Sequence, residues 1–271
     1  MAAWMAASGT NVVAGVTPGK GGQDADGVPV FNTVADARMS FPDIRTSCIV
    51  VPGAHVLGAV QEAVAAGITL VHVITERVPV HDVLAMRRLA AGAGAQLLGP
   101  SSVGFLQFPA FRLGYLGGQN PFAALKEGGV AVLSCSGGMA NETLMALARQ
   151  GTGVRLVMAV GGDAIAGTSL LEAVRIAEAH PGVTGLALFV EPGNALLRGL
   201  ADGTITVSKS VVICLPGDAL ADLPRGMPYG HAGTVLGEED ERPAELRARL
   251  AAKGVRATSH HDEFIRWCTV L

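Results

Sequence analysis

Aromatic side chains are scarce in this chain, whose 271 residues include 8 Phe, 2 Trp and 2 Tyr. So few rings argue against a stacking platform for single-stranded nucleic acid. Charge is also sparse: charged residues make up 16% of the chain, and 20 basic against 23 acidic residues leave a formal net charge of −3. Because no basic stripe stands out, we expect no nucleic-acid partner.

Cysteine is also rare: the four cysteines lie far apart in the sequence and form no C-x-x-C pair. We therefore expect reduced thiols, no disulfide scaffold and no metal site. The N-terminal residues carry no pattern of a secretory signal. Residues 47–75 contain no Lys or Arg, but Pro52 and Gly67 cut them into pieces shorter than the roughly 20 residues that cross a bilayer. We expect a cytoplasmic protein without a membrane partner.

Hydrophobic residues, by contrast, make up 49% of the chain and recur in short β-branched runs. These runs predict strands at 12–16, 48–51, 68–74, 95–98, 130–133, 154–160, 186–190 and 211–215. Alanine-rich stretches between them predict helices at 56–66, 80–91, 139–150, 169–179, 195–201, 243–253 and 262–270. Continuous apolar strands that alternate with helices indicate an α/β protein built on parallel sheets.

A looser segment over 105–126 is rich in glycine and proline and predicts a connection between domains. We therefore expect two parallel-sheet domains, over 1–120 and 121–271. Ligands of such sheets gather at the carboxyl ends of the strands, so the strand-end loops are where function is sought.

Two strand-end loops are built for an anionic ligand. Thr17 to Gly22 combines glycines, which allow close approach, with one cation, Lys20, although the Walker spacing is absent. Ser134 to Gly138 leaves a strand and opens a helix, where free N–H groups and the positive dipole end favour a phosphate. Ordinary helix capping by Ser134 or Ser136 is the alternative interpretation.

A third loop holds a histidine between small residues, Gly230-His231-Ala232-Gly233. A nucleophilic imidazole needs such access and a carboxylate to orient it, and Glu191 ends a strand on the same sheet edge. The pair His260-His261 has no further ligands at metal spacing and is typical of a solvated helix start.

Together these loops resemble the alpha subunit of succinyl-CoA synthetase, a nucleotide-dependent acid–CoA ligase. The resemblance runs in consistent order from about Ser8 to Leu271. It is carried by Gly15 to Gly22, Val28 to Val34, Ile74-Thr75-Glu76, Leu98-Gly99-Pro100, Ser134 to Gly137, Gly161-Gly162-Asp163 and Gly230 to Gly233.

The resemblance implies a Rossmann-like CoA-binding domain followed by a flavodoxin-like ligase domain. It implies that Lys20 and Ile74-Thr75-Glu76 bind CoA and that His231 carries a phosphoryl group. Glu191 would stabilise the phosphohistidine, and the helix start at Ser136-Gly137-Gly138 would hold its phosphate. It also implies an ATP-grasp beta subunit that binds ATP or GTP with Mg, in a hetero-oligomer that acts on a small carboxylic acid.

The chain departs from the family pattern at several places. The family begins with a strand and a glycine-rich turn that cradles CoA, whereas this chain starts within the following helix, so the Rossmann-like domain is incomplete and we expect weak CoA binding. Lys20 and Thr75-Glu76 should still meet at the carboxyl edge of one sheet. Ser101 replaces an asparagine, Cys135 an arginine and Asn141 a tyrosine that helps to bind the acid, which makes succinate doubtful as the substrate.

Two rival hypotheses stay open beside an acid–CoA ligase subunit. The first is an acyl-phosphate-forming subunit that passes the acyl group to a nucleophile other than CoA, such as an amine. The second is a non-catalytic CoA-binding or regulatory protein. The glycine-rich turn that is missing favours the first rival, and the histidine loop argues against the second.

Overall fold

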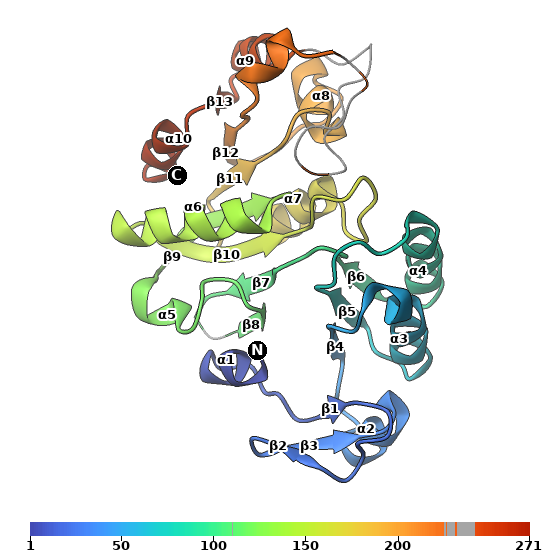
Figure 1. Cartoon of the computed structure of the whole chain (residues 1–271). Coiled ribbons are helices and arrows are strands. Elements are labelled where there is room, and N and C mark those ends of the chain that lie inside the picture. The colour runs from blue at the N-terminus through green and yellow to red at the C-terminus, as the bar shows by residue number, and fades with distance from the viewer. Residues whose placement is uncertain (110, 225, 227–230, 232–241) are drawn as a thin grey trace.

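The computed structural model describes every residue except 110, 225, 227–230 and 232–241, and Figure 1 gives its course. The first part of the chain forms α1 (Ala2–Ala7), β1 (Gly15–Val16), β2 (Asp24–Ala25), β3 (Val28–Phe31), α2 (Val34–Ser40), β4 (Thr46–Ile49), α3 (Gly53–Ala65), β5 (Leu70–Val73), α4 (Val80–Gly92) and β6 (Gln96–Leu98). The second part forms β7 (Gly104–Gln107), β8 (Phe111–Gly114), α5 (Pro121–Ala124), β9 (Lys126–Ser134), α6 (Gly137–Arg149), β10 (Gly153–Ala159), α7 (Leu170–Ala179), β11 (Gly185–Phe189), α8 (Ala195–Asp202), β12 (Ser210–Cys214), the 3-10 helix η1 (Asp218–Asp222), α9 (Pro243–Ala252), β13 (Arg256–Thr258) and α10 (His261–Cys268). The predicted α/β class is confirmed.

The largest sheet has seven strands in the order β13-β12-β11-β9-β10-β7-β8. Its strands from β13 to β10 are parallel, whereas β7 and β8 form an antiparallel hairpin at the edge. Ala159, Ser134, Phe189 and Cys214 pair in one row across four neighbouring strands. This row marks the carboxyl edge of the sheet, where the loops of the site begin.

Both faces of this sheet are covered by helices, which explains the continuous apolar strands. In β9, Val130 and Val132 pack with side chains of α6 and α10. Ala131 and Leu133 point the other way and pack with side chains of α7, α8 and α9. In the part of the chain that the structure describes, no helix is long and apolar enough to span a lipid bilayer.

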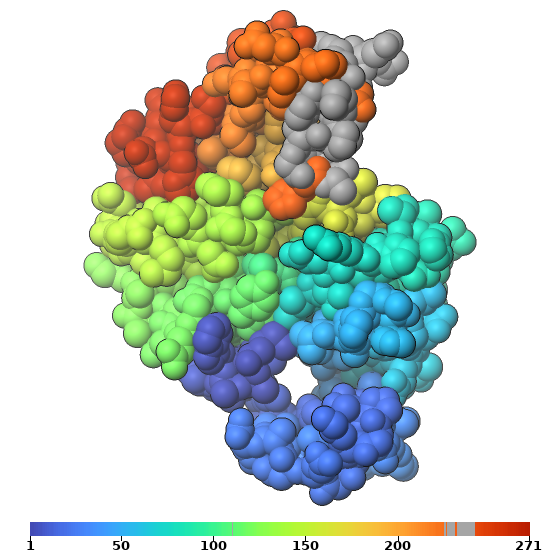
Figure 2. Space-filling model, in the orientation of Figure 1, coloured from blue at the N-terminus to red at the C-terminus, as the bar shows by residue number. Residues whose placement is uncertain are grey.

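The strands of the first part form two separate three-stranded sheets, β1-β3-β2 and β4-β5-β6. We expected Lys20 and Thr75 to lie at the edge of one sheet, and this prediction is wrong. Lys20 follows β1 and Thr75 follows β5, and no strand among the described residues pairs with both β1 and β4. Figure 2 shows an opening between the blue lobe of β1 to β3 and the rest of the molecule.

The segment predicted as a loose connection over 105–126 is partly regular. Residues 105–107 belong to β7 and residues 111–114 form β8, its antiparallel partner, while β7 also pairs with β10 of the large sheet. Gly114 of β8 packs closely on the ring of His72 in β5. A Cβ at Gly114 would lie 2.9 Å from Cε1 of His72, so this contact requires glycine. The sheets therefore divide between β6 and β7, while a domain division at 120/121 stays a prediction.

Candidate active site

The structure brings His231 and Glu191 together beyond the carboxyl edge of the large sheet. Glu191 follows β11, and its Oε1 lies 2.6 Å from Nδ1 of His231. The Glu191 side chain is 19% exposed and the His231 side chain is 45% exposed. The carboxylate is therefore mostly shielded, while the imidazole is open to a second reactant. The motif neighbours Gly230, Ala232 and Gly233 lie outside the described residues.

This contact decides which ring nitrogen can react. A carboxylate beside Nδ1 favours the tautomer with the proton on Nδ1, which leaves a lone pair on Nε2. The arrangement therefore fits a nucleophilic imidazole whose developing positive charge is balanced by Glu191.

The turn after β10 forms a floor beneath the ring. A Cβ at Gly162 would lie 2.4 Å from Cγ of His231, so the imidazole rests directly on the Gly162 backbone. Any side chain at this position would displace the ring.

The start of α6 lies at the same sheet edge. Ser136 caps the helix, accepting a hydrogen bond from the N–H of Met139 at 3.4 Å. Ser134 Oγ fixes this cap, since it donates to the Ser136 carbonyl at 2.7 Å and accepts from the Ser136 N–H at 2.9 Å. Among the described residues, the N–H groups of Gly137 and Gly138 have no acceptor. Free N–H groups at a helix start suit a phosphate.

Cys135 separates these two serines and lies against Glu191. Burial raises the pKa of its thiol to about 12, and the Glu191 carboxylate adds to the shift. Asn194 Nδ2 donates to the sulfur at 3.6 Å. The chain therefore places a neutral thiol beside Glu191, where the family pattern has a cation.

Asn141, predicted to meet the acid, uses both ends of its amide within the protein. Its Oδ1 accepts from the N–H of Gly117 at 2.7 Å, and its Nδ2 donates to the carbonyl of Gly137 at 3.3 Å. The side chain thus ties the segment after β8 to the first turn of α6. Its contact with a substrate stays a prediction.

Lys20 projects from a turn that a single side chain organises. Asn32 Oδ1 accepts hydrogen bonds from the N–H groups of Gly19 and Gly21, both at 2.9 Å. The Lys20 side chain is exposed and forms no ion pair with any described residue. A pocket of about 310 Å³ opens beside the turn and is lined in part by Phe31. A lone exposed cation beside glycines suits a phosphate group.

Ile74, Thr75 and Glu76 follow β5 at the carboxyl end of the small sheet. Thr75 Oγ1 donates to the carbonyl of Val51 at 2.7 Å, and Glu76 is exposed. Desolvation, together with the charge of Glu76, raises the pKa of Tyr115. Within the described residues, no hydrogen bond or ion pair joins this group to Lys20.

Sequence reasoning missed one connection in this region. Ser101 Oγ donates to Asp163 Oδ2 at 2.6 Å, although Asp163 had no predicted role. The available signals were the serine in place of the family's asparagine and the aspartate directly after two glycines. Among the described residues, no cluster of His, Cys, Asp and Glu could hold a metal ion.

Two protein families match parts of this chain. A CoA-binding domain family matches residues 3–77, and a CoA-ligase family matches residues 133–211. The alpha 2 subunit of an ADP-forming succinate–CoA ligase from Archaeoglobus fulgidus is 36% identical over 92% of this chain and 84% of its own length. A subunit of an ADP-forming sulfoacetate–CoA ligase from Bilophila wadsworthia is 30% identical over 90% of this chain and 88% of its own.

Among solved structures, ATP citrate lyase from Methanothrix soehngenii superposes with a TM-score of 0.79 at 24% identity. The match covers 90% of this chain but 41% of that longer chain, and it shows a shared fold. An acid–CoA ligase fold and a histidine–carboxylate pair at its sheet edge thus occur in one molecule. The chain belongs to the family of succinate–CoA ligase alpha subunits.

Proposed function

We propose that this chain is the alpha subunit of an acid–CoA ligase in which His231 carries a phosphoryl group between two reactants. The observation that carries the proposal is the 2.6 Å contact of His231 Nδ1 with Glu191 Oε1. It leaves Nε2 as the ring nitrogen that can react, and the His231 side chain is 45% exposed at a sheet edge that also holds the start of α6. The ligase names of the relatives and their coverage of this chain support the reaction class.

The chemistry explains why such a histidine is needed. A carboxylate is inert toward a thiol until one oxygen becomes part of a phosphate leaving group. The γ-phosphoryl group of ATP or GTP bonds to Nε2 of His231 and a nucleoside diphosphate leaves. An oxygen of the acid then attacks phosphorus, which frees the imidazole and forms an acyl phosphate. The CoA thiol attacks the acyl carbon, and inorganic phosphate leaves.

The residues of this chain have distinct roles in that sequence. Glu191 holds the ring and balances its positive charge, while the N–H groups of Gly137 and Gly138, behind the Ser136 cap, hold the phosphoryl oxygens. Lys20 meets a phosphate of CoA, and Ile74, Thr75 and Glu76 meet CoA from the other sheet. Nucleotide and its Mg bind to an ATP-grasp beta subunit, and we expect the complex to act in the cytoplasm.

Labelling with ATP that carries radioactive γ-phosphate tests the proposal. Incubation of the chain with its beta subunit should label His231 with an acid-labile, alkali-stable phosphoryl group, as a phosphoramidate is. His231→Ala should abolish the label. His81→Ala is the matched control, because His81 is an exposed histidine whose Nε2 lies 3.3 Å from Asp82 Oδ1 on α4. Equal labelling of wild type and His231→Ala would refute the assignment.

A further inference from the structure

Two adjacent serines join the loop after β6 to the end of β10. Ser101 Oγ donates to Asp163 Oδ2 at 2.6 Å, and Ser102 Oγ donates to the carbonyl of Ala159, also at 2.6 Å. Ser102 is fully buried. Both bonds therefore connect the small sheet β4-β5-β6 with the large sheet, at the place where β6 leads into β7 (Figure 1).

Each end of the Ser101–Asp163 bond continues toward one half of the site. The Ser101 N–H donates to the carbonyl of Thr75 at 3.0 Å, so Ser101 is tied to the group that follows β5. Asp163 directly follows Gly162, whose backbone contacts the His231 ring. One hydrogen bond thus links the strand end of the first sheet to the floor beneath the histidine.

The backbone on both sides of this bond is unusual. Ser101 has a φ of +58°, in the left-handed region that is unfavourable for serine. Gly161 has a φ of +107°, and a Cβ there would lie 2.4 Å from the carbonyl oxygen of Pro100. The left-handed backbone of Ser101 persists only when surrounding contacts hold it. The bond from Ser101 to the Asp163 carboxylate suits this purpose, because a hydrogen bond to a charged group is stronger than one between neutral groups.

We propose that Ser101 and Asp163 are positioning residues that hold the Gly161-Gly162 turn beneath His231 and fix the imidazole relative to the Thr75 end of β5. This inference rests on the proposed function of His231. Neither residue touches the reacting atoms. Losing the bond should let the turn relax away from the ring, so that the imidazole samples orientations that do not react.

The test compares Ser101→Ala and Asp163→Ala with wild type in the complex with the beta subunit. The rate constant of His231 phosphorylation should fall by about 10-fold to 100-fold, because small displacements of a reacting group have effects of this size. The KM for nucleotide should not change, since nucleotide binds to the other subunit. Ser101→Asn should restore most of the rate, because asparagine tolerates the left-handed region and its amide N–H can donate to Asp163.

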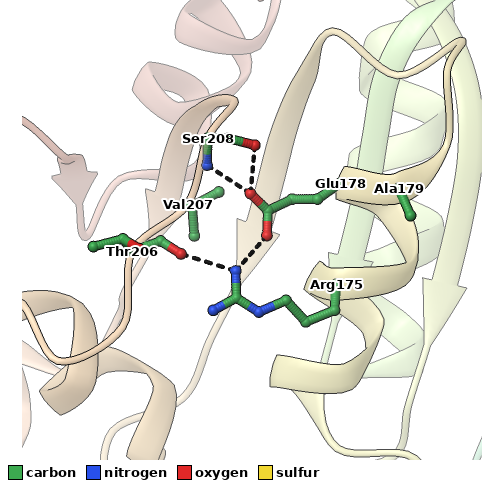
Figure 3. Close-up of a pocket in the computed structure, with 6 residues that line it drawn as sticks. All are labelled: Arg175, Glu178, Ala179, Thr206, Val207 and Ser208. Atoms are coloured by element: carbon green, nitrogen blue, oxygen red, sulfur yellow. Dashed lines mark hydrogen bonds and ion pairs between the residues drawn. The ribbon is translucent and has the colours of Figure 1, made fainter.

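Ser208→Ala is the matched control. Ser208 Oγ also donates to a carboxylate oxygen, Glu178 Oε1, at 2.8 Å, beside the pocket between α7 and the loop before β12 (Figure 3). This serine has no part in the proposed site, so the variant should phosphorylate at the wild-type rate. A loss of similar size in Ser208→Ala would mean that any lost serine–carboxylate bond slows the enzyme, and it would overturn the positioning role.

A second measurement needs neither nucleotide nor partner. Long-range nitrogen–proton NMR of the chain alone should show His231 with its proton on Nδ1, and this signal should shift or broaden in Ser101→Ala and Asp163→Ala. Unchanged ring signals and rates within twofold of wild type would overturn the inference. If wild type itself is not phosphorylated, the proposed function fails, and the NMR comparison alone decides the positioning role.

Discussion

Replacing Glu191 with glutamine should slow the phosphorylation of His231 by about 10-fold to 100-fold and leave the fold intact. The carboxylate oxygen lies 2.6 Å from Nδ1 of His231, as expected for a charge-assisted hydrogen bond. Such a bond contributes about 1.5–3 kcal/mol, against about 0.5–1.5 kcal/mol for a neutral one. The midpoints of these ranges differ by about 1.25 kcal/mol, close to the roughly 1.4 kcal/mol that corresponds to a tenfold change in rate.

A second effect of the same substitution acts on the tautomer. If the glutamine amide donates to Nδ1, the ring proton moves to Nε2, and the nitrogen that attacks phosphorus loses its lone pair. This effect adds to the lost charge and sets the upper end of the expected range. The 45% exposure of the His231 side chain limits both effects, because water screens the interaction.

The assay is a rapid-quench measurement of acid-labile phosphate on the chain at saturating nucleotide. Asp82→Asn is the matched control, since it removes the carboxylate from the His81–Asp82 pair at 3.3 Å without touching the site. Circular dichroism should give the same melting temperature for the Glu191→Gln variant within a few degrees. A wild-type phosphorylation rate in that variant would contradict the orienting role of Glu191.

Three further outcomes are expected. Gly162→Ala should displace His231 and abolish its phosphorylation, because a Cβ at Gly162 would lie 2.4 Å from Cγ of the His231 ring. Gly138→Ala should fold normally, since a Cβ at Gly138 would meet nothing closer than 3.9 Å. Lys20→Ala should weaken the CoA affinity measured by calorimetry about 2-fold to 5-fold, which is the effect expected from losing one exposed ion pair with a CoA phosphate. Lys253→Ala should leave the CoA affinity unchanged. The three buried cysteines are Cys135, Cys214 and Cys268, and burial raises the pKa of each thiol from 9.0 to about 11 or 12. At pH 8 these thiols should resist a thiol reagent until the protein unfolds, and unfolding above pH 9 should be favoured because it releases their protons.

The large sheet could be predicted from the sequence because each of its parallel strands is a continuous apolar run. The run at 211–215 predicts β12, observed at Ser210–Cys214, and the run at 186–190 predicts β11, observed at Gly185–Phe189. Both faces of these strands are buried, so their hydrophobicity does not alternate and stands out from the loops.

The β7–β8 hairpin escaped prediction because its sequence carries the residues that usually mark loops. Gly104 and Gly114 lie opposite each other in the pairing register, and a Cβ at Gly104 would lie 1.9 Å from the carbonyl oxygen of Leu113. Here glycine allows two strands to approach closely. Composition alone does not distinguish that use from a flexible connection.

Part of the candidate site followed from topology and part did not. Glu191 and His231 were expected near one sheet edge, and the structure has their side chains in contact, while their roles stay predictions. The shared sheet expected for Lys20 and Thr75 was wrong, because strand order depends on hydrogen-bond partners that a single sequence does not specify. The Ser101–Asp163 bond joins residues 62 positions apart, and no local pattern predicts such a contact.

A single-turnover chase tests most directly whether His231 carries the phosphoryl group to the acid. The complex is phosphorylated with labelled ATP, freed of nucleotide by gel filtration, and then mixed with a carboxylic acid that it uses in steady state and with CoA. We expect the label to leave His231 as inorganic phosphate while one acyl-CoA forms per phosphohistidine, with no nucleotide present. Label that stays on the protein, or acyl-CoA that forms only after nucleotide is added again, would contradict a phosphohistidine intermediate.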